Sequence, residues 1–267
     1  MKRIVALLLV CVMSFAFSAC GNQTAQEGKT DSDLDYVKNK GEMIIGYTLF
    51  APMNYKDDNN KLIGFETEFA EALCERLGVK PVFQEIDWDS KEVELNSKNI
   101  DCIWNGMSIT DERKQNMSVS DPYMNNRQVL IVRKGDVDKY KSNIDGAAVV
   151  AEKGSVGEEV IETNEFFKNA KYTALDSQAK GLVEVKAGTS DIVVTDYVLA
   201  CGSIGEGTDY KELAIIDKDF EPECYGVAFR KGSDVTAEFN KIVKEMMQDG
   251  ALQKIAAKYK LEDLLVK

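Results

Sequence analysis

The spacing of apolar residues along the first third of the chain switches between that of a strand and that of a helix. Three short runs rich in β-favouring residues predict strands: residues 43–47, 79–85 and 101–105. Between the first two runs, four apolar residues share one helical face: Phe65, Phe69, Leu73 and Leu77. Gly78 directly after them is a typical helix stop, and a shorter helix is expected at residues 93–97. This alternation favours a mainly parallel sheet, in which ligands bind at the carboxyl ends of the strands.

The middle of the chain repeats the alternation. Four more strands are expected: residues 129–132, 147–151, 172–175 and 192–195. Helices are expected from Val156 to Thr163 and through Leu182. A strand at residues 225–230 precedes a helix whose apolar face consists of Phe239, Ile242, Val243 and Met246. Gly250 interrupts that helix, and a last helix is expected at residues 251–259. The sequence therefore predicts an α/β fold.

The N-terminus has an apolar run of a different kind. Lys2-Arg3 precedes the apolar residues 4–17, and Ser18-Ala19-Cys20 follows them. A basic start, a short apolar run and small residues are typical of a secretory signal, and the run is short for a membrane span. A cysteine at this place resembles the lipobox of bacterial lipoproteins, in which that cysteine carries a lipid and becomes the mature N-terminus. Phe17 replaces the usual leucine, and a plain secretory signal with an incidental cysteine is the alternative.

The composition after this segment narrows the possible functions. The polar residues that follow predict a lipoprotein signal peptide over 1–19 and a flexible tether over 20–33. The formal net charge of −12 becomes −14 when Lys2 and Arg3 are removed with the signal peptide. An acidic chain without a long basic run is a poor partner for nucleic acid or anionic lipid. The chain has no histidine, which excludes Ser-His and Cys-His catalysis and a histidine-ligated metal, so we expect no metal and no cofactor.

Four cysteines remain after the predicted processing: Cys74, Cys102, Cys201 and Cys224. None has the spacing of metal ligands. Outside the cell they could form disulfides in three connectivities. Cys74 and Cys102 lie in apolar patterns, so buried free thiols are an equal alternative for those two.

The strongest candidate chemistry lies between Gly106 and Lys114. We expect a strand end, a glycine turn, a cap at Thr110 and the first turn of a helix. A glycine carbonyl, the Ser108 hydroxyl and Arg113 then stand close together. Such a group suits a small anion, because guanidinium binds a carboxylate through two parallel hydrogen bonds. On spacing alone, an ordinary turn with a surface arginine is the alternative.

In this order the segments resemble the extracytoplasmic amino-acid-binding proteins of ABC importers, solute-binding family 3. The resemblance covers about residues 43–259. The residues that carry it, besides Gly106 to Lys114, are Gly64-Phe65-Glu66-Thr67-Glu68, Asn99-Ile100-Asp101, Ser120-Asp121-Pro122-Tyr123, Gly154-Ser155, Asp191 with Asp196, Tyr225-Gly226-Val227-Ala228 and Arg230-Lys231-Gly232. It implies a two-lobed periplasmic-binding-protein fold (type II), with two crossover strands as a hinge. Lobe one would comprise 34–126 and 225–267, lobe two 129–223, and the crossings would lie near Arg127-Gln128 and Glu223-Cys224.

The resemblance also implies roles for particular residues. A free amino acid is a zwitterion, and neither of its charges can be buried unpaired. Arg113 and Ser108 match the groups that bind the carboxylate, together with the helix start at Ser155-Val156. Asp196 matches the ammonium-binding acid, with the Gly106 carbonyl as a second acceptor. The alternative for Asp196 is a helix N-cap.

The residues that would recognise the ligand's side chain follow from the same resemblance. Phe50 and Trp88 match aromatic residues that enclose it, and the alternative for both is the core of lobe one. Glu66 matches an acid that meets a cationic side chain in some relatives, and the alternative is a helix-start charge. Asn105 and Lys153 are polar residues expected near the pocket, where they would contact a polar side chain of the ligand. Tyr47-Thr48 replaces an aspartate of many relatives, which weakens any transfer of specificity for basic amino acids. The expected ligand is a polar or charged L-amino acid rather than a branched aliphatic one.

Two functions remain open. The first is a monomeric substrate-binding lipoprotein, anchored through Cys20 on the extracytoplasmic face of the cell membrane, that delivers an amino acid to an ABC permease. The second is a cyclohexadienyl dehydratase-like enzyme on the same fold. A murein-cleaving relative would need a further catalytic domain. The dehydratase would need a cleft carboxylate as acid or base. Glu66 and Asp196 are the expected cleft acids, and both have binding roles, which favours the first function.

Overall fold

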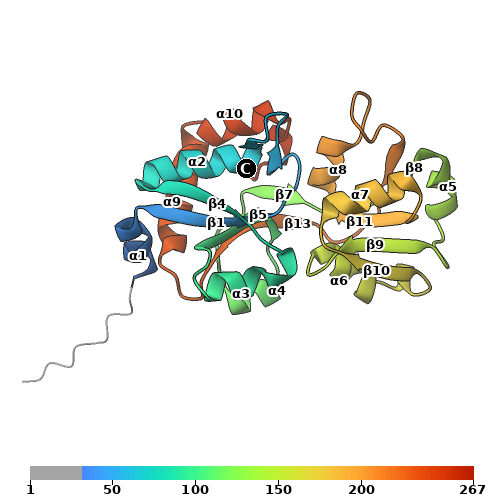
Figure 1. Cartoon of the computed structure of the whole chain (residues 1–267), viewed down its shortest axis with the longest axis horizontal. Helices are drawn as coiled ribbons and strands as arrows, with labels where there is room; N and C mark the ends of the chain where they lie inside the picture. The colour runs from blue at the N-terminus through green and yellow to red at the C-terminus, as the bar shows by residue number, and fades with distance from the viewer. Residues whose placement is uncertain (1–31) are drawn as a thin grey trace, which may run out of the picture. The chain divides into compact units, whose positions relative to one another are not determined.

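The computed structural model describes residues 32–267, which form two α/β lobes (Figure 1). The predicted signal peptide with Cys20, and nearly all of the predicted tether, lie outside the described residues. Each lobe is built on its own sheet, with helices packed against it. We call them lobe 1 and lobe 2 in the order in which the chain enters them.

Lobe 1 contains a six-stranded sheet of order β4-β1-β5-β13-β6, with β7 paired to β13. Its strands are β1 (Glu42–Tyr47), β4 (Lys80–Glu85), β5 (Cys102–Ser108), β6 (Ser118–Val119), β7 (Met124–Asn126) and β13 (Glu223–Phe229). β1 pairs in parallel with β4 and β5, whereas β13 is antiparallel to β5, β6 and β7. A small hairpin of β2 (Tyr55–Lys56) and β3 (Leu62–Ile63) lies outside this sheet.

Helices cover both faces of the lobe 1 sheet (Figure 1). One face carries α2 (Phe65–Leu77), α9 (Val235–Gln248) and α10 (Ala251–Lys258), which contact one another. The other face carries α3 (Lys91–Asn96) and α4 (Asp111–Asn116). Short 3-10 helices occur at η1 (Trp88–Ser90) and η4 (Glu262–Leu264). The C-terminal helices therefore return to the lobe in which the described chain begins.

Lobe 2 contains a five-stranded sheet of order β10-β9-β11-β8-β12. Its strands are β8 (Gln128–Arg133), β9 (Ala148–Glu152), β10 (Lys171–Leu175), β11 (Ile192–Asp196) and β12 (Leu213–Ile216). β10, β9 and β11 are parallel, and β8 runs antiparallel to β11 and β12. Its helices are η2 (Lys134–Asp136), α5 (Val137–Tyr140), α6 (Val156–Thr163), η3 (Glu165–Phe167), α7 (Gln178–Ala187) and α8 (Tyr197–Ser203).

The two crossings between the lobes lie next to each other. β7 ends at Asn126 and β8 begins at Gln128, so the first crossing is centred on Arg127. The chain returns between β12 and β13, and Glu223 of β13 is already paired with Asn126 of β7. The return crossing thus precedes Glu223, slightly earlier than the predicted Glu223-Cys224.

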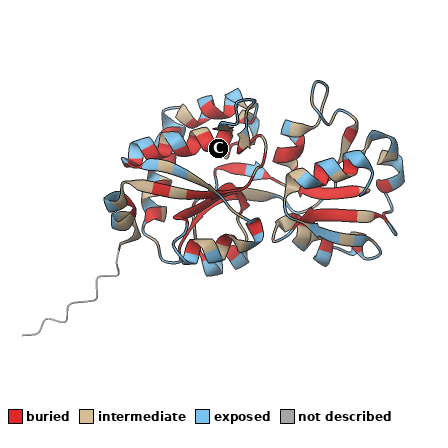
Figure 2. Ribbon diagram, in the orientation of Figure 1, coloured by how far each residue is buried: buried red, intermediate tan, exposed pale blue. Residues whose placement is uncertain are grey.

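The core of lobe 1 is an aromatic cluster between α2, β5 and α9. The rings of Phe69 and Trp104 lie 4.8 Å apart between centroids, and those of Trp104 and Phe239 lie 5.1 Å apart. All three side chains are buried, and those of Phe69 and Phe239 belong to the predicted apolar helix faces. Figure 2 shows that buried residues gather along the strands of both sheets. Full burial of each such side chain contributes roughly 1.5–3 kcal/mol to folding. Trp104 is therefore a core residue of lobe 1.

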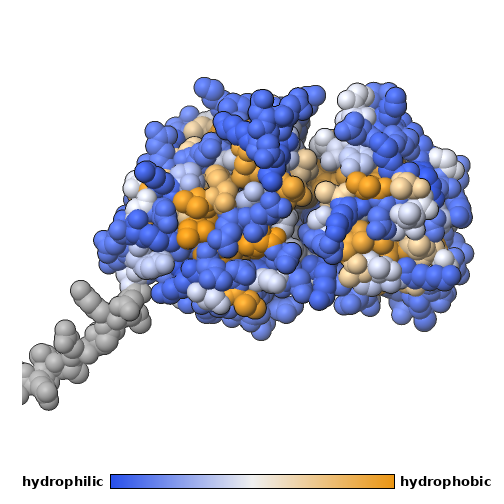
Figure 3. All heavy atoms as spheres, in the orientation of Figure 1, coloured by the Kyte–Doolittle hydropathy of each residue, from blue (hydrophilic) through white to orange (hydrophobic). Residues whose placement is uncertain are grey.

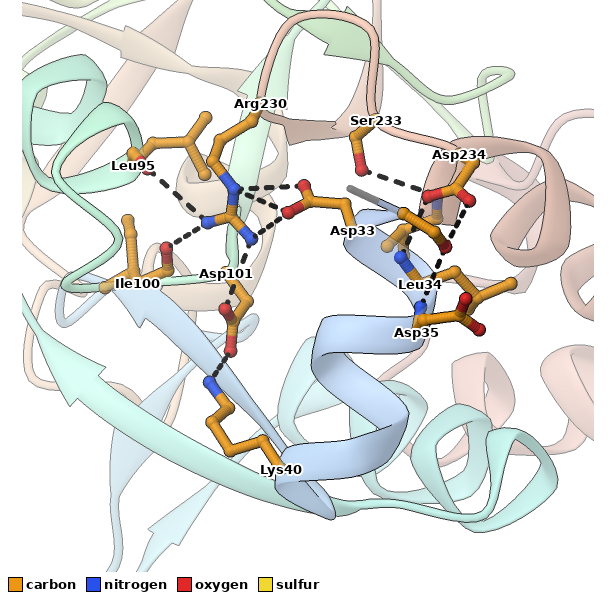
Figure 4. A network of polar contacts seen from close by, with 12 residues as sticks. Asp33, Leu34, Asp35, Lys40, Leu95, Ile100, Asp101, Arg230, Ser233 and Asp234 are labelled. Carbon is orange, nitrogen blue, oxygen red and sulfur yellow. Dashed lines mark hydrogen bonds and ion pairs between the residues drawn. The ribbon is translucent and has the colours of Figure 1, made fainter. Parts of the chain in front are cut away.

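The sequence pattern did not predict the helix α1 (Asp33–Lys40), because its residues are mostly polar. Contacts from distant parts of the chain hold it in place (Figure 4). The Arg230 guanidinium donates to both carboxylate oxygens of Asp33 at 2.9–3.0 Å, and it also contacts Asp101. The Ser32 hydroxyl caps α1 and donates to Asp234 at 2.6 Å. The predicted tether, which ended at residue 33, therefore ends earlier, because these tertiary contacts stabilise the helix.

The four cysteines of the described chain are free thiols. Cys74 and Cys102 are buried, whereas Cys201 is exposed, so the disulfide alternative does not occur in this structure. Between residues 32 and 267 there is no helix with the length and apolar character that a membrane span requires. The same residues contain no cluster of three potential metal-binding side chains of the His, Cys, Asp or Glu type.

Candidate functional site

The carboxyl end of β5 and the start of α4 form the turn that the sequence predicted. The Thr110 side chain caps α4 by accepting a hydrogen bond from the Arg113 backbone N–H at 3.2 Å. This cap directs the Arg113 side chain back along the strand end, where Nη1 donates to the Ser108 carbonyl at 2.7 Å. Arg113 is only 8% exposed. The alternative of a surface arginine is therefore wrong.

Figure 3 shows a groove between the two lobes. Residues from both lobes also line one small cavity. Eight of the predicted site residues lie around it: Phe50, Trp88, Gly106, Ser108, Arg113, Ser155, Val156 and Asp196. The cavity has a volume of about 10 Å³, which is close to the space that one water molecule requires. A ligand the size of an amino acid can enter only if the lobes or the lining side chains move apart.

Arg113 is a buried cation without an anion. Its Nη2 donates to the Gly154 carbonyl of lobe 2 at 3.2 Å, and its guanidinium carbon lies 5.9 Å from the centroid of the Trp88 ring. Burial lowers its pKa, while Glu223 and Asp196 act in the opposite direction from a distance. Among the described residues, no carboxylate forms an ion pair with it. A buried guanidinium in this state has the charge and the hydrogen-bond donors to pair with an anionic group.

Asp196 is the corresponding buried anion on lobe 2. It is the last residue of β11 and precedes α8, but its side chain does not cap that helix. Instead its carboxylate accepts hydrogen bonds from the side-chain amides of Asn126, Gln128 (3.0 Å) and Gln178. Asp196 therefore occupies the N-cap position of α8, but its carboxylate makes no capping hydrogen bond. Burial raises the pKa of Asp196, because the charged form loses its hydration. A cation beside the carboxylate would oppose this effect and favour the charged form.

Glu66 does not line the cavity. Its two carboxylate oxygens accept from the Gly106 N–H at 2.9 and 3.0 Å, and one also accepts from the Tyr123 hydroxyl. Burial raises its pKa to about 7. The prediction that Glu66 meets a cationic ligand side chain is corrected by this placement, because Gly106 lies between Glu66 and the cavity. Glu66 instead fixes the Gly106 backbone, which adopts a positive φ of 55°.

The two other polar candidates differ in position. Asn105 lines the cavity, but it is held by Thr48 and Asn54: its Nδ2 donates to the Thr48 carbonyl and to Asn54 Oδ1, both at 2.9 Å. Lys153 points away from the cavity and pairs with Asp89 of lobe 1 at 2.9 Å. Lys153 therefore links the rims of the two lobes, and its predicted place in the pocket is corrected.

Sequence reasoning missed two lining residues, Glu152 and Gln178, and it named Thr48 only as a departure from the aspartate of relatives. Glu152 is the last residue of β9 and is 4% exposed. The sequence could have indicated Glu152 as a site residue, because it directly follows the predicted strand at residues 147–151 and ligands of α/β sheets bind at such strand ends. We expected Glu66 and Asp196 to be the acids of the cleft. Asp196 lines the cavity, but the second acid there is Glu152 and not Glu66.

The profile of the bacterial extracellular solute-binding proteins, family 3, matches residues 43–262. The chain belongs to this family. The L-cystine-binding protein TcyA of Bacillus subtilis is 32% identical over 274 residues, which cover 99% of each chain. The arginine-binding extracellular protein ArtP of the same organism is 28% identical over 263 residues, which cover 97% of this chain and 98% of ArtP. Among solved structures, a histidine-bound substrate-binding protein of an ABC uptake transporter from Streptococcus pneumoniae has a TM-score of 0.81 at 28% identity, over 89% of this chain and 99% of that one. The fold is therefore the two-lobed, type II fold of amino-acid-binding proteins.

In this solute-binding protein the lobes meet directly beside the cavity. Lys91 Nζ of lobe 1 donates to the Gly154 carbonyl of lobe 2 at 3.1 Å, next to the bond from Arg113. Lys91 also donates to the Trp88 carbonyl at 3.1 Å, and burial lowers its pKa to about 8. The Gly154 carbonyl thus receives donors from two cations of the opposite lobe. The described conformation is one in which the two lobes are in contact.

Proposed function

We propose that this solute-binding protein captures one L-amino acid between its lobes and delivers it to the permease of an ABC transporter. One observation carries the proposal. Arg113 of lobe 1 and Asp196 of lobe 2 line the same cavity, both are buried, and neither forms an ion pair in the described chain. Because an amino acid has one carboxylate and one ammonium close together, it supplies the partner that each residue lacks.

The neighbouring groups complete both ends of such a ligand. Ser108 lies beside Arg113, and Val156 opens α6, where the N–H groups of the first turn lack helical partners. These groups would bind the carboxylate. The Gly106 carbonyl would join Asp196 at the ammonium. Phe50 and Trp88 supply apolar walls that exclude water from the charges.

Delivery requires a protein that stays near its permease outside the cytoplasm. We assign an extracytoplasmic location with a lipid on Cys20, in accord with the extracellular family and with the basic, apolar and small residues before that cysteine. A single lipid signal and a polar tether would leave both lobes free to bind and close. In the host cell, Cys20→Ala should move the protein from the membrane fraction to the soluble fraction. Retention of the variant on membranes would contradict the lipid assignment.

A specific observation favours the dehydratase-like alternative as a second candidate. Burial, and secondarily Asp196, raise the pKa of Glu152 to about 8, so a protonated carboxyl faces the cavity near neutral pH. A carboxyl in that state can act as a general acid. Incubation with prephenate or arogenate, followed by product analysis, separates the two candidates. Turnover that is lost in Glu152→Gln would favour the enzyme.

A melting-temperature screen against the common amino acids and cystine tests the binding function. A ligand at about 100 times its dissociation constant adds roughly 2.7 kcal/mol to the free energy of unfolding. Isothermal titration calorimetry on each positive ligand should give one site per chain. If no amino acid raises the melting temperature, the proposed function is wrong.

A further inference from the structure

The charged groups that line the cavity outnumber those of a simple zwitterion. Three ionisable side chains of the described chain face it: Arg113, Asp196 and Glu152. In the proposed function, the ligand's carboxylate pairs with Arg113 and its ammonium pairs with Asp196. Glu152 is then left without a counterpart on the ligand's backbone.

Glu152 also lacks a cationic partner on the described part of the protein, where the hydrogen-bonding residue beside it is the neutral amide Gln178. Its Oε1 is buried and has no hydrogen-bond partner among residues 32–267, and the side chain forms no ion pair there. Lys91 is the cation whose charge lowers the pKa of Glu152. Its ammonium, however, already donates to the Trp88 and Gly154 carbonyls. Burial of a polar atom without a partner is costly, and such atoms are rare in folded proteins.

We propose that Glu152 is the specificity-determining residue of the site and selects an amino acid whose side chain ends in a guanidinium or an ammonium group. This rests on the proposed function, because it presumes an amino acid held by Arg113 and Asp196. The cation of such a side chain would donate to the unpartnered oxygen of Glu152. A neutral side chain could at most donate a hydrogen bond to that oxygen, and it would leave the charge of an ionised Glu152 uncompensated.

The residues around Glu152 lead to a second testable property, a pH dependence of ligand affinity. Asp196 faces it from β11, Lys91 from α3 and Gln178 from α7, and burial with Asp196 raises its pKa to about 8. Near neutral pH the free protein therefore holds a proton on Glu152, and an incoming cation would displace it. Affinity for a cationic side chain should rise with pH up to about 8, by at most tenfold per pH unit. Affinity for a neutral amino acid should not follow this profile.

Isothermal titration calorimetry with two matched ligand pairs tests the proposal. L-arginine and L-citrulline have nearly the same shape but differ in charge. L-lysine and L-norleucine share a four-carbon side chain, and only lysine carries the terminal ammonium. We expect at least one cationic ligand to bind the wild type at least tenfold more tightly than its neutral counterpart. Its binding should release a proton between pH 6 and 8, detected as a dependence of the binding enthalpy on the buffer.

Glu152→Gln preserves the shape of the side chain and removes its charge. The variant should lose most of the preference for the cationic ligand and the proton release, while binding of the neutral counterpart shows that it is folded. Glu162→Gln, on the exposed side of α6, is the matched control and should behave as the wild type. An unchanged preference in Glu152→Gln would overturn the proposal, as would a wild type that binds only neutral amino acids. In the latter case the proposed function stands, whereas failure of every amino acid to bind would overturn both.

Discussion

Gly202 of lobe 2 approaches Pro52 of lobe 1 so closely that a β-carbon at Gly202 would lie 2.6 Å from the proline Cδ. This approach belongs to the conformation in which the lobes are in contact, and neither residue lines the cavity. It gives a way to alter lobe closure without changing the ligand site.

We expect Gly202→Ala to weaken amino acid binding by about 1–3 kcal/mol, because the added carbon overpacks the closed state and not the open one. Calorimetry and small-angle X-ray scattering should show lower affinity and a larger radius of gyration at equal ligand concentration. Gly135→Ala, where no atom lies within 4 Å of the added carbon, is the control and should bind normally. Equal affinities of the two variants would show that Gly202 does not limit closure.

Arg113→Ala should reduce affinity by roughly 2–5 kcal/mol, because the ligand's carboxylate would be buried without its counter-charge. Arg113→Lys should restore little, since an ammonium cannot form two parallel hydrogen bonds with a carboxylate. Arg76→Ala removes an exposed ion pair with Asp249 and is the control, with no expected effect on binding. Wild-type affinity of Arg113→Ala in calorimetry would contradict the site.

Asp196→Asn should weaken binding of amino acids strongly and binding of a ligand without the α-amino group much less. The reason is that only the first kind of ligand presents an ammonium to the carboxylate. The variant also places an amide among the amides of Asn126, Gln128 and Gln178, so we expect a loss of about 1–3 kcal/mol in unfolding free energy. Titration of both ligands into the folded variant measures the difference, and equal losses would contradict the ammonium role.

The ligand-free protein should become less stable as pH rises from about 4.5 to 8. Burial raises the pKa of Glu66 and Glu223 to about 7 and that of Glu152 to about 8, so the native state binds more protons than the unfolded state in this window. The stability from these groups is complete below the unfolded pKa and is lost as pH passes the folded pKa. Each group contributes at most about 1.4 kcal/mol per pH unit. Melting temperatures measured across this range give the slope of stability against pH. This slope should be shallower in Glu152→Gln than in the wild type. A wild-type melting temperature that rises with pH would contradict the assignment.

Ligand binding should close the lobes about Arg127 and the return crossing before Glu223. Trp88 lines the cavity, whereas Trp104 lies in the core of lobe 1, so binding should change the fluorescence of Trp88 alone. In Trp88→Phe, most of that change should disappear although calorimetry still detects binding. Solution scattering of the wild type should show a smaller radius of gyration with saturating ligand, and an identical curve would exclude closure.

Much of the fold could be predicted from local pattern. The spacing of Phe65, Phe69, Leu73 and Leu77 with Gly78 after them corresponds to α2, which ends at a left-handed glycine cap. The cap at Thr110 and the helix from Val156 to Thr163 were also predicted, because caps and amphipathic periods depend on residues three or four apart. Several elements were not predicted, among them α1, which depends on Arg230 far along the chain, and β12, whose pairing with β8 completes the lobe 2 sheet.

The sequence by itself determined the main alternation of strands and helices, the turn that carries Arg113, and the strand ends at which most site residues lie. Tertiary structure alone decided which carboxylates reach the ligand. Glu66 and Glu152 are both buried acids at the edge of an apolar segment, yet Glu66 points behind Gly106 and Glu152 faces the cavity. The physical reason is that the direction of a side chain into a cleft depends on strand register and on the apposition of two lobes. Those contacts join residues that are far apart in sequence, so no local pattern records them.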